Sequence, residues 1–209
     1  MRNGNGNHHS HEMIFDAASY YRLLAQTYSA LPRGRVDEIA DAICDAYEGG
    51  RAIFLFGNGG SASLASHFAC DLGKGTSDPA SERRRLRVSA LTDNLPTITA
   101  LANDLSYADI FSEQLKSFVE SGDVALAISC SGNSPNVLKG LEVARAVGAT
   151  TVGLGGFQGG KMKELCDLCL IVPSDNMQII EDVHLTVAHC VFTIVRNRIC
   201  AAEQEKAAY

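Results

Sequence analysis

Short apolar runs alternate with longer amphipathic stretches along most of this chain. The runs that predict β-strands are residues 52–56, 86–91, 124–128, 150–154 and 168–172. Between them, apolar residues recur at intervals of three and four positions, which predicts helices. These are expected at 62–72, 96–103, 110–119, 136–147 and about 177–199. A further helix, after the glycine-rich residues 155–160, is expected to end at 165. Strands separated by helices are typical of a parallel sheet covered on both faces, so the pattern predicts an α/β fold.

Two further helices are predicted ahead of the first strand, at 15–31 and 36–47, with a break at 32–34. The apolar face of the second consists of Val36, Ile39, Ala40, Ile43 and Tyr47. An apolar N-terminal helix of this kind often packs on a partner subunit, so we expect a homo-oligomer. Residues 1–12 are rich in Gly, Asn and His, which predicts a disordered leader. Residues 13–209 are then expected to form a single domain.

Composition narrows the class of protein. The chain has 209 residues, 46% hydrophobic and 20% charged, which suits one globular α/β domain. Its formal net charge of −6 argues against a broad nucleic-acid or anionic-membrane surface. We see no apolar run near the roughly 20 residues that span a bilayer and no signal-peptide pattern, so no membrane association is expected.

Seven scattered cysteines are typical of reduced, buried thiols in a cytoplasmic protein rather than of a disulfide framework. Cys166 and Cys169 form a CxxC pair. Because no second pair exists and this one leads into a predicted strand, metal or redox use is the less favoured interpretation.

Two turns carry the candidate binding chemistry. Residues 57–61 follow the first strand, and residues 129–135 follow the third. A strand that enters a glycine-rich turn at a helix start directs free backbone N–H groups and the positive helix end at one spot. The serines of these turns can add hydroxyl donors to a phosphate monoester, although they could also only cap helices. Both turns fall on the carboxyl edge of the sheet, where such folds bind ligands, so the sequence predicts a small phosphorylated substrate.

Nucleotide binding is the competing interpretation. Residues 57–62 formally match G-x-G-x-x-A, a pattern that is weak alone. The acidic residue that should end a second strand corresponds only to Asp78, which lies in a predicted loop beside a proline. The basic run 83–85 in that loop could contact a phosphate, but such runs are more often solvated.

Ionisable residues in two predicted helices suggest acid–base or metal chemistry. His67 and Asp71 lie four residues apart and so share a face. The closing helix contributes Glu181, Asp182, His184 and His189 within an apolar segment. Burying such groups is costly unless they pair or bind a cation. They could form a site for Zn²⁺ or a similar divalent ion, or serve as a metal-free acid–base pair. The spacing does not decide whether Glu181 or Asp182 faces the site.

Several segments together resemble the sugar isomerase (SIS) domain family, specifically the sedoheptulose 7-phosphate isomerases. They are GNGGSASLASHFACDL, LANDLSY, AISCSGNSPNVLKGLEVARAVGATTVGL, GGKMKELCD and EDVHLTVAHCV. The resemblance covers residues 15–199 and implies a flavodoxin-like five-stranded parallel sheet and a homotetramer with shared active sites. It also implies conversion of D-sedoheptulose 7-phosphate to D-glycero-D-manno-heptose 7-phosphate through a cis-enediol.

The resemblance further implies roles for individual residues. Substrate contacts would come from Asn58, Gly59, Gly60, Asn103, Asp104, Ser129, Cys130, Ser131 and Ser134, with Ser61 from the first turn, and also from Asp71 and Glu181. Asp71 and His189 would be catalytic. A divalent metal ion, with Zn²⁺ as the favoured identity, would be held by His67, Asp71, Glu181 and His189. Three positions depart from the family: Cys130 replaces a threonine, Asp71 a glutamate and Glu181 a glutamine.

A non-catalytic relative, a replication-initiator-associating protein, resembles the isomerases but lacks the late histidine. His189 therefore favours an enzyme. The alternatives are a sugar-phosphate-binding or initiator-associating scaffold, and an NAD(P)-binding domain.

Overall fold

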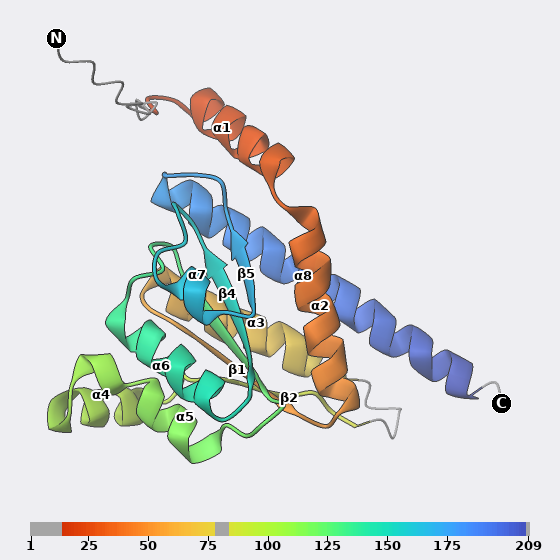
Figure 1. The fold of residues 1–209 in the computed structure, drawn as a ribbon. Coiled ribbons are helices and arrows are strands. Elements are labelled where there is room, and N and C mark those ends of the chain that lie inside the picture. Colours follow the sequence, from red (N-terminus) through yellow and green to blue (C-terminus); the bar gives the residue numbers. More distant parts are fainter. Residues whose placement is uncertain (1–13, 78–83, 208–209) are drawn as a thin grey trace, which may run out of the picture.

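A five-stranded parallel sheet forms the centre of the protein (Figure 1). The structure, a computed structural model, describes residues 14–77 and 84–207. The strands are β1 (Ala52–Gly57), β2 (Arg87–Ala90), β3 (Val124–Ser129), β4 (Thr150–Gly155) and β5 (Leu168–Ile171). Their order, β2-β1-β3-β4-β5, is that of flavodoxin-like folds and not the 3-2-1-4-5-6 order of dinucleotide-binding domains. The fold prediction is confirmed, and the topological switch point lies between β1 and β3.

The helices follow the predicted pattern with small changes at their ends. They are α1 (Ala17–Ala30), α2 (Arg33–Glu48), α3 (Gly60–Gly75), α4 (Leu95–Asp104), α5 (Ser112–Phe118), α6 (Pro135–Ala146), α7 (Met162–Leu165) and α8 (Met177–Ala207), with a 3₁₀ turn η1 (Tyr107–Asp109) before α5. The predicted break at 32–34 is narrower than expected, because α2 begins at Arg33, directly after the proline. The predicted leader, residues 1–12, lies outside the described residues.

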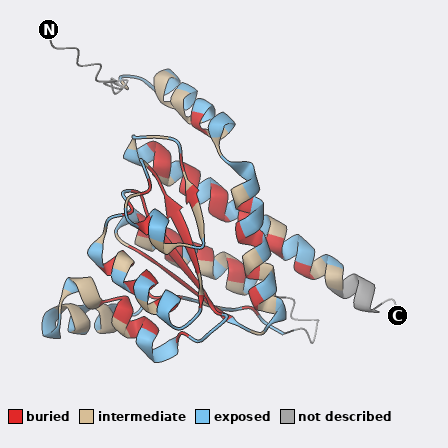
Figure 2. Cartoon of the chain, in the orientation of Figure 1, coloured by how far each residue is buried: buried red, intermediate tan, exposed pale blue. Residues whose placement is uncertain are grey.

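Alternate side chains of the central strands enter two separate cores. On β1, Ile53 and Leu55 pack with buried residues of α2, α3 and α8. Phe54 and Phe56 point to the other face, where they pack with α5 and α6, and the rings of Phe56 and Phe111 lie 5.2 Å apart. Burial is concentrated along the sheet and on the inward faces of these helices (Figure 2). The all-buried strand β1 is what a parallel sheet covered on both faces requires.

Helix α8 packs closely across α3. A methyl group added at Gly75 would stand 2.4 Å from the Phe192 ring, so the absence of a side chain there permits the contact. By length and composition alone, the stretch Met177–Ala202 could cross a membrane, so the expectation that no such run exists is wrong. Its residues Val183, Val187 and Val191, however, are buried in the core. We therefore describe α8 as a core helix of the α/β domain.

Helix α1 projects beyond the sheet (Figure 1), and within the described part of the chain its main packing partner is α8. The Tyr20 hydroxyl donates to Asp182 at 2.6 Å, and the hydroxyls of Tyr28 and Thr186 lie 2.7 Å apart. The hydrogen bond to Asp182 raises the pKa of Tyr20 to about 12. Asp182 thus has a structural partner on α1.

Candidate active site

Two histidines and an aspartate meet on neighbouring faces of α3 and α8. The Nε2 atom of His67 lies 3.3 Å from Asp71 Oδ2 and 3.3 Å from His189 Nε2. His189 Nε2 is 3.8 Å from Asp71 Oδ2, so one ligand atom of each residue lies within 4.8 Å of the others. The side chains of His67 and His189 are about half exposed, at 49% and 50%.

This group has the donor chemistry of a divalent metal site. Two imidazole nitrogens and one carboxylate oxygen converge on one point, and three protein ligands with an open side are typical of catalytic zinc. Without a cation, His67 and His189 can satisfy each other only if one imidazole donates and the other accepts. The three residues can therefore hold a metal ion. Without a metal, they can exchange protons with one another.

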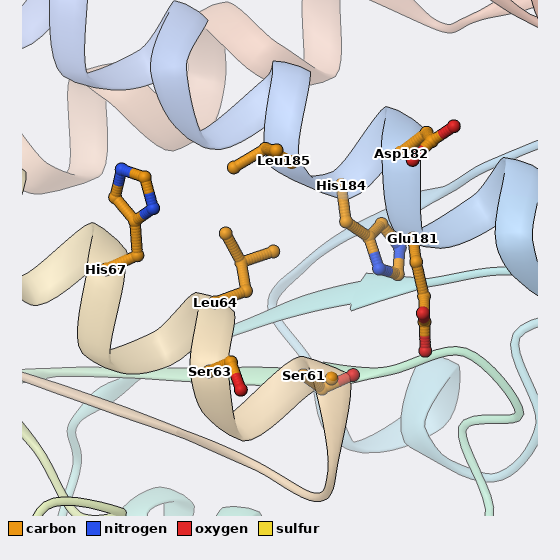
Figure 3. A pocket seen from close by; sticks show the side chains of 9 residues that line it. Ser61, Ser63, Leu64, His67, Glu181, Asp182, His184 and Leu185 are labelled. Carbon is orange, nitrogen blue, oxygen red and sulfur yellow. The ribbon is translucent and has the colours of Figure 1, made fainter.

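A cavity of about 280 Å³ extends from this group along the groove between α3 and α8 (Figure 3). His67 lies at one end, and Ser61 and Glu181 lie at the other. Both carboxylate oxygens of Glu181 are 3.1 Å from where a Cβ on Gly60 would stand, so Glu181 covers the start of α3. The sequence predicted Glu181 as a fourth metal ligand. In the structure it lies apart from the group formed by His67, Asp71 and His189. Of the two acidic neighbours in α8, Glu181 faces the first turn and Asp182 binds Tyr20.

In the first turn, the side chain of Asn58 is engaged within the protein. Its amide nitrogen donates to Asn136 Oδ1 at 2.9 Å, and the amide nitrogen of Asn136 donates back to Asn58 Oδ1 at 2.8 Å. The Tyr107 hydroxyl donates to the same Asn58 oxygen at 2.9 Å. Gly59, with a φ of 55°, is the N-cap residue of α3. Asn136 and Tyr107 could not be identified from the sequence, since a helix-start asparagine and an exposed tyrosine carry no distinctive spacing.

The second turn is stabilised by its own serines and by the loop after β4. Ser129 Oγ accepts from the N–H of Gly132 at 3.2 Å, and Ser131 Oγ accepts from the N–H of Asn133 at 3.3 Å. Gly132 has a φ of 63° and lies so close to Gly159 that a Cβ would clash with the Gly159 carbonyl at 2.0 Å. Two of the serines thus shape the turn. Ser134 precedes α6 as predicted, but its side chain makes no capping hydrogen bond.

Cys130 connects the second turn to Ser61, which lines the cavity. Its thiol is buried and interacts with the Ser61 side chain. Burial, reinforced by the negative charge of Glu181, raises the pKa of Cys130 to about 11. Cys130 is therefore a neutral thiol that can donate a weak hydrogen bond where the family has a hydroxyl.

His184 lines the cavity, and its ring has a structural role. Its Nε2 atom lies 3.0 Å from the carbonyl oxygen of Gly155, and its side chain is almost fully buried. Burial lowers its pKa to about 4, so the ring is neutral at physiological pH. Within the described residues its Nδ1 atom has no hydrogen-bond partner.

Among the described residues, Asn103, Asp104 and Arg84 lie apart from the cavity. Asn103 and Asp104 form the exposed last turn of α4, where the Asn103 amide donates to Asp104 at 2.8 Å. Arg84 binds the carbonyl oxygens of Tyr47 and Glu48 at the end of α2, so its role is structural. Arg83 is outside the described residues.

Comparison with known proteins agrees with this architecture. The SIS domain family model matches residues 17–156. A probable phosphoheptose isomerase from Thermoplasma acidophilum is 39% identical over 183 residues, which is 88% of this chain and 99% of that protein. The phosphoheptose isomerase of Geobacter sulfurreducens is 38% identical over 190 residues, which is 90% of this chain and 99% of that protein. The solved structure of a phosphoheptose isomerase from Francisella tularensis superposes with a TM-score of 0.79 at 32% identity, covering 86% and 96%.

The match of the SIS domain model to residues 17–156 identifies this flavodoxin-like domain as a sugar isomerase domain. The chain belongs to the SIS domain family, in its phosphoheptose isomerase branch. The resemblance stated from the sequence motifs is confirmed.

Proposed function

We propose that this protein is an aldose–ketose isomerase that converts D-sedoheptulose 7-phosphate to D-glycero-D-manno-heptose 7-phosphate. The observation that carries the proposal is the His67–Asp71–His189 group at the end of a cavity that reaches the first switch-point turn. The relatives named phosphoheptose isomerase, which align over most of their length, support the same reaction.

The phosphate is proposed to bind at the second turn. There the helix start of α6, twelve residues long, and the hydroxyls of Ser131 and Ser134 supply donors for an anion. Ser129, Cys130, Ser61 and the Gly59–Gly60 backbone would line the path from that turn towards α3. Phosphate held far from the reacting carbons orients the substrate and supplies no chemistry itself.

The reaction needs proton transfer between C1 and C2 through a cis-enediol. One group removes the proton from carbon and another moves protons on oxygen, and we assign these roles to Asp71 and His189. A divalent metal, Zn²⁺ in this proposal, held by His67, Asp71 and His189 would polarise the substrate carbonyl. Glu181 stands apart from the three ligands, and we propose that it contacts the substrate from the other end of the cavity. We propose that Asn103 and Asp104 also contact the substrate.

The assembly is proposed to be a homotetramer with active sites shared between subunits. His67 and His189 lie on an open face of the chain. Phe15, just before α1, and Tyr21, within α1, are 83% and 67% exposed, which suits burial by another copy. Free cysteines and the net charge of −6 support a cytoplasmic protein that binds neither nucleic acid nor membrane.

The decisive experiment is incubation of purified protein with sedoheptulose 7-phosphate, with and without a chelator, followed by detection of the aldose. Turnover is expected, and His189→Ala should abolish it. Thr193→Ala is the matched control, because Thr193 lies exposed one turn further along the same helix. Substrate binding without any turnover would instead favour a non-catalytic sugar-phosphate-binding scaffold.

A further inference from the structure

A second reactive group lies outside the cavity, at the edge of β4 and β5. The sulfur atoms of Cys166 and Cys169 lie 2.9 Å and 3.0 Å from where a Cβ on Gly153 would stand. Gly153 and Cys169 are direct partners in the sheet, and Cys166 reaches the same point from the end of α7. The two thiols thus share the space left by one glycine, and they are hydrogen-bonded to each other.

This pair differs in its electrostatic surroundings from Cys44, another half-buried thiol. Both side chains are only half-buried, so small reagents can reach them. The hydrogen bond from Cys166, helped by the positive charges of Lys163 and Arg35, lowers the pKa of Cys169. By contrast, burial raises the pKa of Cys44. A cysteine whose pKa is lowered by a hydrogen bond from a neighbouring thiol is the arrangement of a reactive dithiol.

We propose that Cys166 and Cys169 form a reversible intramolecular disulfide, with a small-molecule disulfide such as oxidised glutathione as the oxidant. The Cys169 thiolate attacks one sulfur of oxidised glutathione, forming a mixed disulfide and releasing one glutathione thiolate. Cys166 then gives its proton to the released glutathione thiolate and attacks the Cys169 sulfur, which releases the second glutathione as a thiolate. The two cysteines lose two electrons in total, and oxidised glutathione gains them.

The dithiol is connected to the second turn through α7. The N–H of Cys166 donates to the Met162 carbonyl oxygen at 3.2 Å, and the N–H of Met162 donates to the Gly132 carbonyl oxygen at 2.9 Å. The Met162 methyl group also lies 3.2 Å from the Cβ position of Gly153, directly beside the sulfurs. Closing the disulfide would therefore displace the segment that supports the proposed phosphate-binding turn. This consequence rests on the proposed function and predicts a several-fold higher KM with kcat little changed.

The disulfide itself can be tested without any activity. The full-length protein is incubated with oxidised glutathione, its remaining thiols are alkylated under acid quench, and it is cleaved after glutamate. Peptide 165–181 then contains Cys166 and Cys169 and no other cysteine, while peptide 39–48 contains only Cys44. We expect peptide 165–181 to lose two hydrogen atoms and to recover them with dithiothreitol. In Cys166→Ser, Cys169 should instead retain glutathione.

Two outcomes would overturn parts of the proposal separately. If peptide 165–181 remains reduced while peptide 39–48 is modified, the disulfide is refuted. If the disulfide forms but the KM of the oxidised enzyme equals that of the reduced enzyme, the connection to the second turn is refuted. A protein without isomerase activity would refute the proposed function, and the mass measurement would still decide on the disulfide.

Discussion

The side-chain amides of Asn58 and Asn136 bind each other reciprocally across the switch point of the sheet. One follows β1 and the other begins α6, so this pair ties the first turn to the second. Each amide donates once and accepts once, and Tyr107 donates to the remaining acceptor site on Asn58. The Asn58 side chain is thus used to align the two turns, which leaves the backbone of the first turn to face the ligand.

Replacing Asn136 should therefore loosen both turns. Asn136 is almost fully buried, and Asn136→Ala leaves the Asn58 amide without its partner. We expect a loss of about 1–3 kcal/mol in the free energy of unfolding, from urea denaturation, together with a raised KM. Asn197→Ala, an exposed change on α8, should alter stability by less than about 0.5 kcal/mol. Equal effects of the two variants would contradict the alignment role.

The metal group should depend on each of its three residues. His67→Ala removes one of three convergent donors, so we expect both the bound metal and the activity to fall to background. Metal content is measured by elemental analysis of protein purified without added metal. Thr193→Ala serves again as the control. An active wild-type protein that carries no metal and ignores chelators would show that these residues act as a metal-free acid–base group.

The charge of Glu181 should weaken the binding of an anionic substrate. Glu181→Gln keeps a hydrogen-bond acceptor over Gly60 and removes the negative charge at that end of the cavity. We expect KM to fall by about fivefold, on the order of 1 kcal/mol. Glu142→Gln makes the same charge change on the exposed side of α6 and should leave KM unchanged.

Glu181→Ala separates the two properties of this side chain, because it removes the acceptor as well as the charge. It should raise KM if Glu181 contacts the substrate. If Glu181→Ala lowers KM as much as Glu181→Gln does, the side chain affects binding only through its charge and does not contact the substrate.

His184 should make stability depend on pH in the acid range. Its folded-state pKa of about 4 lies below the ordinary 6.5, so between these values the unfolded chain binds a proton that the folded chain does not. The contribution to stability is complete above pH 6.5 and is lost as the pH falls towards 4. His184→Gln, which keeps a donor for Gly155, should flatten this dependence in urea denaturation at pH 7.5 and 5. An unchanged slope would contradict the assignment.

The sheet and helices were predictable because apolar periodicity reports directly on burial. The run 52–56 and the face of Val36, Ile39 and Ala40 occupy the core as expected. The exception on that face is Tyr47, which stays half-buried while Ala46 is buried in its place. Helical geometry also identified His67 and Asp71 as neighbours, since residues four apart in a helix share a face.

Contacts between elements were less predictable. Glu181 and His189 lie in one helix and were assigned to one metal site, yet eight residues span about 12 Å along a helix. Only the crossing of α8 over α3 decides which of them meets His67. The pairing of Asn58 with Asn136 likewise depends on strand order, which local sequence does not encode. Asn103 and Asp104 came from motif similarity alone, and the described chain does not bring them to the cavity.

The contact between Gly75 and Phe192 has a consequence for the distant metal group. His67 lies two helical turns before Gly75, and His189 lies three residues before Phe192, so both pairs belong to the same crossing. The absence of a side chain at Gly75 therefore permits the close approach of α8 to α3, in which the two imidazole rings stand 5.1 Å apart between centroids. The reach of the proposed metal ligands is fixed by a glycine that touches neither substrate nor metal.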